Sequence, residues 1–353
     1  MISSMNTSDP GKPNHAEQLR KLPKAELHVH LEGTIEPSTV VELAARHGVA
    51  VTLEEAVARY APGTFADFIQ SFIWVTSFLR GPDDYALIAR RCAEDLRRQN
   101  IVYAEVTLSI GVMLRRQQDP AANFAALREA AAQIPDIRLV WIFDAVRQWG
   151  AEPAMEVARI ACELQSPDIV AYGIGGDELA LPTQELRGVY EYVASQGMHR
   201  LIHAGETGGP EMVRESVEML GAERIGHGIS AMHDERTMEV LVERGIPLEI
   251  CPTSNLRTGA LAAQLRIKHT GYEDHPLPRL LRRGVPVTLS SDDPAIFETT
   301  LTGEYLHAGR MGLSTDELVR LAEASFRHSF LPSAEKRALL EQFHSAVAAL
   351  GLL

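Results

Sequence analysis

The segment "KAELHVHLEGT", from Lys24 to Thr34, places two histidines one residue apart at the end of a short apolar run. Alternate side chains of a β-strand point to the same face, so His28 and His30 are expected to project together. Two imidazoles on one face either bind a ligand jointly or form an ordinary buried polar pair. The choice between the two depends on which other polar residues join them.

Further polar residues follow other short apolar segments of the chain. They are His203 and Glu206 in "HAGE", His227 in "GHG", and Asp292 and Asp293 in "SSDDP". Each motif alone is compatible with a structural role. In a parallel barrel, however, the carboxyl ends of the strands meet at one rim, where function gathers. Residues from all of these motifs would then share one site.

Four of these residues form a plausible set of metal ligands. His28, His30, His203 and Asp292 would supply imidazole nitrogens and one carboxylate, which suits zinc and leaves room for a water molecule. Magnesium instead prefers carboxylates and waters. A two-metal centre would need a bridging lysine or carboxylate at the fourth strand, and "GIGGDE" contains no lysine. We therefore expect one zinc ion per chain.

The remaining residues suggest what such a metal would do. Zinc can lower the pKa of a bound water from about 15.7 to near 7, which makes hydroxide available at neutral pH. Glu206, which follows the proposed ligand His203 in "HAGE", is placed to exchange protons with a substrate nitrogen. His227 could orient the hydroxide or stabilise charge beside it, and Asp293 could bind the substrate. The set predicts metal-assisted hydrolysis.

The elements that position these residues are expected to be short apolar strands separated by amphipathic helices. The strand segments are 25–30, 102–108, 137–144, 169–175, 200–204, 223–228, 247–251 and 286–291, and examples of the helices are 82–99, 153–164, 210–220 and 234–244. Continuously apolar strands are typical of parallel sheets buried on both faces. The alternation predicts a (β/α)8 TIM barrel. A doubly wound open sheet is the alternative, although no Gly-rich phosphate loop follows the first strand.

Two segments do not belong to this repeat. Residues 50–80 include the aromatic stretch "FADFIQSFIWVTSFLRG", a helical insertion after the first strand that either adds to the core or covers the pocket. Residues 313–350 are expected to form extra C-terminal helices. Residues 1–15 are polar and are interpreted as a flexible N-terminal segment. Because no internal linker is visible, residues 16–353 are expected to form a single domain.

Composition limits the partners and the compartment. The chain of 353 residues carries a formal net charge of −13, which argues against a nucleic-acid or anionic-membrane partner and leaves a small molecule as the expected one. Three unpaired cysteines favour a reducing compartment, and no apolar run is long enough to cross a bilayer. We expect a cytoplasmic protein. The oligomeric state is not indicated.

Six separated motifs together resemble the adenosine deaminase family of zinc-dependent purine deaminases. They are "PKAELHVHLEGT", "GGDE", "HAGET", "RIGHG", "CPTSN" and "SSDDPAIF", and the similarity runs from Leu22 to about Ser345. The resemblance implies hydroxide attack at the purine C6, a tetrahedral intermediate and loss of ammonia. It also implies the zinc ligands already named, with His30 facing the substrate as well and Asp292 also catalytic.

The resemblance further implies a role for each of the other site residues. Glu206 would give a proton to the purine N1, and His227 would orient and deprotonate the metal-bound water. Asp293 would bind N7. The backbone N–H of Gly176, in "GGDE", would bind N3.

The motifs favour nucleosides as substrates over free adenine. "GHG", "CPTSN" and "GGDE" resemble the nucleoside branch of the family, whereas "HLEGTIEP" is closer to the adenine branch. Glu32 stands where an aspartate of adenosine enzymes would meet the 5′ side of the ribose, so we include it among the substrate-binding residues. An N-terminal cap or a surface carboxylate is the alternative for this side chain.

A nucleoside with a larger 5′ substituent is also possible. The loop 255–276 carries basic residues that either are solvated or bind a carboxylate on such a substrate, as in 6-aminodeoxyfutalosine; they are Arg257, Arg266, Lys268 and His269, with Arg147 after the third strand. Adenosine and 2′-deoxyadenosine are the simpler nucleosides. The alternatives are an adenine deaminase, a different zinc amidohydrolase and, from another class, a non-catalytic binding protein.

Overall fold

The computed structural model describes residues 15–60 and 62–352. The flexible segment expected at residues 1–15 lies outside them, except for His15, which begins the first helix. Eight parallel strands lie side by side in the order of the chain. They are β1 (Lys24–His30), β2 (Ile101–Leu108), β3 (Arg138–Val146), β4 (Ile169–Gly175), β5 (His199–Ala204), β6 (Arg224–His227), β7 (Leu248–Ile250) and β8 (Val287–Leu289). All eight strand predictions are confirmed.

The sheet closes where β1 meets the segment after β8. The backbone N–H of His30 donates to the carbonyl of Asp292, and the N–H of Asp292 donates to the carbonyl of His28, each at 2.9 Å. A parallel bridge between Val29 and Asp292 marks the same seam. The prediction of a TIM barrel is therefore confirmed, and two candidate ligand segments are neighbours in the closing ladder.

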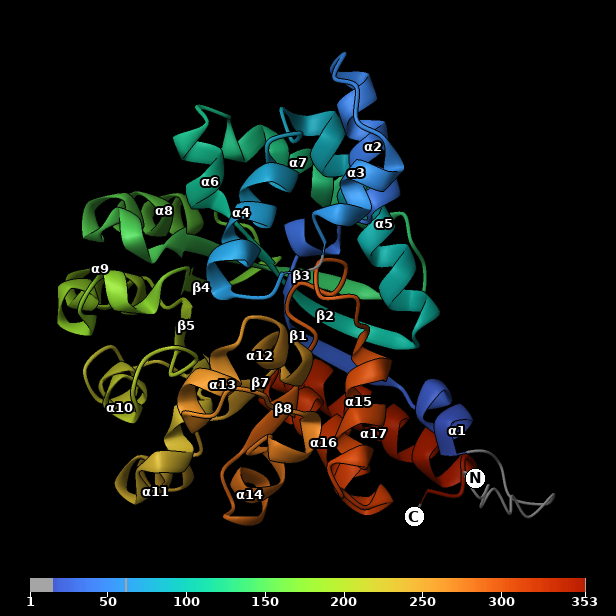
Figure 1. Ribbon diagram of the computed structural model, residues 1–353, viewed down its shortest axis with the longest axis vertical. Helices are drawn as coiled ribbons and strands as arrows, with labels where there is room; N and C mark the ends of the chain where they lie inside the picture. Colours follow the sequence, from blue (N-terminus) through green and yellow to red (C-terminus); the bar gives the residue numbers. More distant parts are fainter. Residues whose placement is uncertain (1–14, 61, 353) are drawn as a thin grey trace.

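Helices surround the strands in chain order (Figure 1). The longer ones are α2 (Pro37–Arg46), α5 (Pro82–Arg98), α7 (Pro120–Ala132), α8 (Ala151–Glu163), α9 (Arg187–Ser195), α10 (Pro210–Glu218), α11 (Glu235–Arg244) and α15 (Leu301–Arg310). The short ones are α1 (His15–Lys21), α3 (Leu53–Ala58), α6 (Ile110–Arg115), α12 (Pro252–Arg257), α13 (Ala260–Leu265) and α14 (Leu277–Arg282). The 3₁₀ turns are η1 (Glu32–Thr34), η2 (Arg147–Trp149), η3 (Glu178–Ala180), η4 (Thr183–Leu186), η5 (Ile229–His233) and η6 (Tyr272–Asp274). None of the described helices is long and apolar enough to span a bilayer.

The aromatic insertion after β1 forms α4 (Phe65–Thr76). Thr64 begins this helix by accepting a hydrogen bond from the N–H of Asp67, as expected of an N-cap residue. Phe68 packs against Phe297, which follows the β8 motif, with ring centroids 5.0 Å apart. Several apolar side chains of α4 also line the cavity described below. The helix therefore covers the pocket and packs on the barrel at once.

The C-terminal helices are α16 (Thr315–His328) and α17 (Ser333–Ala349), which matches the predicted extra helices. Ser314 begins α16 with a capping box that includes Glu317. α16 packs against both β1 and β8, so it covers the seam where the barrel closes. This placement buries the outer face of the ladder that holds the candidate ligands.

Candidate active site

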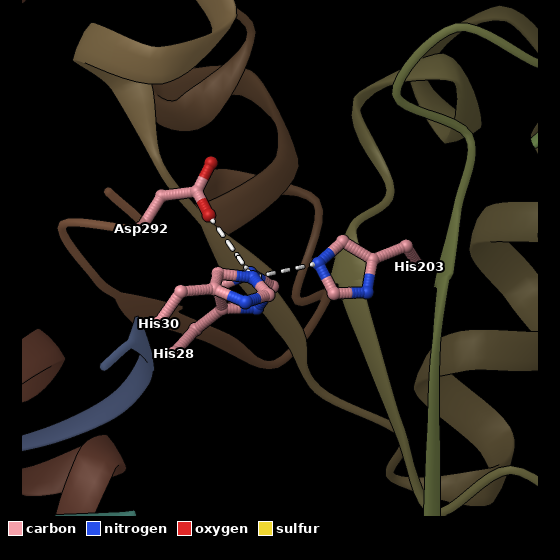
Figure 2. Close-up of side chains that lie close together, drawn as sticks. All are labelled: His28, His30, His203 and Asp292. Carbon is pink, nitrogen blue, oxygen red and sulfur yellow. Dashed lines mark hydrogen bonds and ion pairs between the residues drawn. The ribbon is translucent and has the colours of Figure 1, made fainter. Parts of the chain in front are cut away.

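Three histidines and one aspartate converge at the carboxyl ends of the strands (Figure 2). One ligand atom from each of His28, His30, His203 and Asp292 lies within 4.8 Å of the others. Asp292 Oδ1 is 3.4 Å from Nε2 of both His28 and His30, and the Nε2 atoms of His30 and His203 are 3.3 Å apart. The sequence prediction placed these residues at one site, and the geometry agrees.

The outer nitrogens of two of these rings are held by hydrogen bonds. Nδ1 of His28 lies 2.7 Å from a carboxylate oxygen of Glu249, and Nδ1 of His203 lies 3.0 Å from the carbonyl of Ile174. Because both partners can only accept, each Nδ1 carries the proton and each Nε2 presents a lone pair to the centre. Nε2 of His28 is buried and has no hydrogen-bond partner among the described residues. An orphaned lone pair in such a donor set fits a metal ion of the zinc type.

A network of buried charged side chains holds the ring of His28 through its Nδ1 atom. Glu249 lies between His28 and Arg224, and its Oε1 is 2.6 Å from Nε of Arg224. The guanidinium of Arg224 also contacts Glu105 at 2.6 Å, and all of these side chains are fully buried. Burial alone would lower the pKa of His28, but the neighbouring carboxylates of Asp292 and Glu249 outweigh it and raise the pKa well above the ordinary value, so a bound metal ion would take the place of a proton on Nε2. Sequence analysis missed this network.

Two site residues have strained backbones. His227 and Asp292 have φ angles of 60° and 66°, in the left-handed region that residues other than glycine rarely adopt. The ladder contacts to β1 hold Asp292 in this conformation. Nε2 of His227 lies 3.7 Å from Glu206 Oε2 and 3.9 Å from Asp292 Oδ2. The strain is thus located where the two side chains face the proposed metal.

A cavity of about 440 Å³ opens onto the cluster of His and Asp side chains. Its inner end is lined by most of the predicted site residues, namely His30, His203, Glu206, His227, Asp292, Asp293 and Gly176. The volume lies within the range of about 300–1,000 Å³ that is usual for small-molecule sites. The predicted catalytic residues therefore share one accessible pocket.

Two carboxyl groups in this pocket have surroundings that favour their protonated form. Burial, together with the charges of Glu178 and Asp292, raises the pKa of Glu206 well above its ordinary value. Burial and the neighbouring Asp292 do the same to the pKa of Asp293, whose Oδ1 is buried without a partner among the described residues. Both side chains can then donate a proton or a hydrogen bond to a ring nitrogen.

Glu178, the last residue of "GGDE", has a role that sequence analysis did not find. Its carboxylate accepts hydrogen bonds from the backbone N–H groups of Gly205, Glu206 and Gly208, at 3.0, 3.0 and 2.8 Å. The loop after β5, which carries the candidate proton donor Glu206, therefore folds around this buried carboxylate. The neighbouring Gly176 has a φ of 97°, and a Cβ there would meet the side chain of Gln148.

Glu32 differs from its expected place at the sugar end of the pocket. It is buried in η1, where Oε1 accepts a hydrogen bond from the N–H of Ser109 at 3.1 Å, and it is not among the cavity-lining residues in the described part of the chain. Burial raises its pKa to about 7. The surface-carboxylate alternative is wrong as well. Glu32 instead packs behind Ser109, which does line the cavity.

The basic residues proposed to bind a 5′ substituent also lie elsewhere. Arg147 is buried, with Nε donating to the carbonyl of Leu181 at 2.9 Å and Nη2 to Thr183 Oγ1 at 3.2 Å. The four basic residues of the loop 255–276 are exposed, and none belongs to the described lining of the cavity. The carboxylate-binding alternative is therefore wrong for these residues, because η2 turns Arg147 into the protein, and the solvated alternative is confirmed for the four residues of the loop.

Two other arginines do reach the cavity. Arg115 and Arg116, at the end of α6, line its outer part with Trp149 and the aromatic residues of α4. The guanidinium of Arg115 lies over the ring of Trp149, 5.0 Å from its centroid. Arg116 donates to the carbonyl of Ile73 and to Thr76 Oγ1, at 3.1 and 2.9 Å. The consecutive arginines in "MLRRQQ" were the available signal, but no motif marked them.

Comparisons with known proteins agree with the architecture and with the family that the motifs resemble. The profile of the family described as adenosine deaminase matches residues 23–346. An aminodeoxyfutalosine deaminase of Streptomyces coelicolor is 39% identical over 93% of this chain and 85% of its own length. An adenine deaminase of Agrobacterium fabrum is 30% identical over 92% of this chain and 98% of its own length. The crystal structure of an adenine deaminase from Arthrobacter aurescens superimposes with a TM-score of 0.85, at 28% identity, over 93% of this chain and 99% of that one. The family predicted from the six motifs is therefore confirmed, and the chain belongs to the adenosine deaminase family.

Proposed function

We propose that this protein hydrolyses the 6-amino group of a purine nucleoside, that its preferred substrate is 6-aminodeoxyfutalosine, and that it uses one zinc ion per chain. The observation that carries the proposal is a single cavity with two chemically different ends. The inner end contains the His and Asp cluster, and the outer end contains aromatic side chains and two arginines. A nucleoside with an anionic aromatic substituent matches both ends.

The metal would be held by His28, His30, His203 and Asp292, whose ligand atoms lie close enough to share one ion. When bound, zinc lowers the pKa of water and so supplies the hydroxide nucleophile at neutral pH. Glu249 and the carbonyl of Ile174 would keep two of the rings in the tautomer that can bind a metal. These supporting contacts favour a preorganised centre.

The residues beside the cluster supply the proton and the substrate contacts. Glu206, protonated by virtue of its burial, would give its proton to the purine N1 and so stabilise the charge that develops on the ring. Protonated Asp293 would donate a hydrogen bond to N7, and the N–H of Gly176 would donate to N3. All three line the inner end of the cavity. His30 and Asp292 face the same space.

The outer wall distinguishes between the candidate substrates. Free adenine would leave the space between α4 and Trp149 unused. A carboxylate at the far end of a larger nucleoside could pair with Arg115 or Arg116, while an attached ring would stack among Phe65, Phe68 and Trp149. Relatives 37–39% identical to this chain are named aminodeoxyfutalosine deaminases, whereas those named adenine deaminases are 30–34% identical. Adenine deamination is the alternative.

The partners and the cellular compartment that we propose follow from the composition of the chain. A small molecule and water are the proposed partners, because the net charge of −13 opposes binding to nucleic acid or anionic lipid. A cytoplasmic location is supported by three free cysteines. We further propose that residues 16–353 act as one domain.

The test is ammonia release by the zinc-loaded protein with adenine, adenosine, 2′-deoxyadenosine and 6-aminodeoxyfutalosine, compared as kcat/KM. Highest turnover of the futalosine compound supports the proposal. Highest turnover of adenine would replace it with the adenine alternative. Zinc-loaded Glu206→Gln provides the matched control, because it keeps the shape of the side chain but cannot cycle a proton. Absence of turnover by the unaltered protein would refute the deaminase assignment.

A further inference from the structure

A chain of buried hydrogen bonds reaches His227 from the side opposite the cavity. It includes Asn255, in α12, and His275, which lies between η6 and α14. Asn255 and His275 are 0% and 4% exposed, and neither is among the described residues that line the cavity. Although they do not line the cavity, their contacts determine how His227 can act.

The first link fixes the protonation of His275. The backbone N–H of Leu277 donates to Nδ1 of His275 at 3.1 Å. A backbone N–H can only donate, so Nδ1 carries a lone pair and the ring proton is on Nε2. Burial also lowers the pKa of His275 to about 3, which is consistent with a neutral ring.

The second link fixes the orientation of the Asn255 amide. Nε2 of His275 lies 3.2 Å from Asn255 Oδ1. Because Nε2 carries the proton, the amide oxygen must face His275, and the amide NH₂ group must face the other way. On that side, Nδ2 lies 3.2 Å from Nδ1 of His227.

The third link fixes His227. The amide N–H of Asn255 donates to Nδ1, so the single proton of a neutral His227 ring is on Nε2. Nε2 is the atom that lies 3.7 Å from Glu206 Oε2 and 3.9 Å from Asp292 Oδ2, beside the proposed metal. The nitrogen that faces the reaction thus presents a hydrogen instead of a lone pair.

We infer that His275 and Asn255 are positioning residues which hold His227 in its Nε2–H tautomer, so that His227 donates a hydrogen bond to the attacking oxygen instead of removing its proton. This inference rests on the proposed function and changes the deprotonating role that the family resemblance implied. When water becomes the hydroxide that attacks C6, its O–H bond breaks and the proton goes to Asp292 Oδ2, which lies 3.9 Å from Nε2 of His227. Asp292 Oδ1 remains with His28 and His30.

The direct test is the ¹⁵N spectrum of zinc-loaded protein labelled at its histidine rings, in which protonated and bare ring nitrogens are distinguished. The signal of His227 is assigned by its loss in His227→Gln. A protonated Nε2 and a bare Nδ1 are expected. A bare Nε2 with a protonated Nδ1 would overturn the inference without any measurement of activity.

Variants of His275 test whether the chain sets this tautomer. His275→Leu removes the donor to Asn255, so the amide is free to rotate and the Nε2–H signal of His227 should decrease. kcat should then fall at least tenfold, with KM and zinc content unchanged. His275→Gln should restore both signal and kcat, because its amide can accept from Leu277 and donate to Asn255. His269→Gln, on the exposed part of the same loop, is the matched control.

The outcomes separate this inference from the proposed function. If the unaltered protein turns over none of the nucleosides, the proposed function fails, but the ring spectrum still reports the tautomer. If His275→Leu changes the tautomer and kcat stays the same, the positioning role is refuted. If His275→Leu does not fold, the test uses His275→Gln. Loss of the Nε2–H signal of His227 in that folded variant would contradict the inference.

Discussion

Replacing Glu178 by glutamine should unfold part of the active-site loop without touching any group that reacts. The carboxylate accepts three backbone N–H groups, two on Oε2 and one on Oε1. A glutamine has only one acceptor oxygen. If that oxygen keeps the contacts with Gly205 and Gly208, the new NH₂ group faces the N–H of Glu206, and two donors oppose each other.

The size of the effect follows from these contacts. A hydrogen bond to a charged group contributes about 1.5–3 kcal/mol, and the two that remain would weaken because their acceptor is no longer charged. We therefore expect Glu178→Gln to lower the free energy of unfolding by about 2–4 kcal/mol. The released N–H belongs to Glu206, so the candidate proton donor itself moves. A misplacement of about 1 Å can cost about 10²-fold in rate, and kcat should fall by that order with a small change in KM.

Urea unfolding and steady-state kinetics of the zinc-loaded variant measure the two effects. Glu185→Gln is the matched control, because Glu185 is exposed in the same segment and should change stability by less than about 0.5 kcal/mol. If Glu178→Gln loses less than about 1 kcal/mol of stability and keeps its kcat, the carboxylate does not organise the loop and the reasoning is refuted.

Three other predictions concern the metal, the outer wall and pH. Chelation should lower the unfolding free energy by about 4 kcal/mol relative to protein with zinc at a thousand times its Kd, as measured by thermal unfolding; an unchanged melting curve would contradict a structural contribution of the site. Arg115→Ala should raise KM for 6-aminodeoxyfutalosine about tenfold and leave KM for adenosine unchanged, since a charge-assisted contact contributes about 1.5–3 kcal/mol; equal effects on both substrates would exclude carboxylate recognition. Burial lowers the pKa of His275 to about 3, so its contribution to stability is fully present above its unfolded pKa of about 6.5 and is lost as pH falls towards 3, by up to about 1.4 kcal/mol per unit. Between pH 6 and pH 5, the free energy of unfolding of His275→Gln, measured by denaturant titration, should therefore fall less steeply than that of the unaltered protein. The same pH dependence in both proteins would disprove the contribution of His275.

The barrel and the cluster of ligands could be predicted because both depend on local features. Apolar segments of strand length mark each strand, and a residue at the carboxyl end of any parallel strand must reach the same rim. His28, His203 and Asp292 could thus be grouped although they are far apart in the sequence. No knowledge of the connecting helices was needed for that step.

Contacts that depend on loop geometry could not be predicted in this way. Glu178 reaches the loop after β5 because η3 turns its side chain inwards, and the motif "GGDE" does not encode that turn. Arg147 was considered as a pocket residue and is buried outside the cavity lining, whereas Arg115 and Arg116 reach the pocket from α6. For such long side chains, the direction is decided by where a short helix begins, and sequence patterns locate that point poorly.

The buried charges of the strands escaped prediction for a different reason. Glu105, Arg224 and Glu249 each lie on a strand, and the sequence analysis gave none of them a role. In the barrel they meet and lead to His28, so that a ligand on β1 is held by residues of β2, β6 and β7. An isolated buried charge is unfavourable, and a charge in a strand therefore indicates that partners lie on neighbouring strands.

The seam where the barrel closes also holds most of the candidate metal site. The segment that contains Asp292 pairs with β1 through the backbones of His28 and His30, and α16 packs over this pairing. Three of the four candidate ligands are thus fixed by a hydrogen-bonded ladder that does not require a metal, and only His203 comes from across the barrel. Closing the barrel brings the His and Asp side chains together, and the left-handed backbone of Asp292 is maintained by the same ladder. The strain and the preorganisation of the site therefore have a common origin in the closure of the fold.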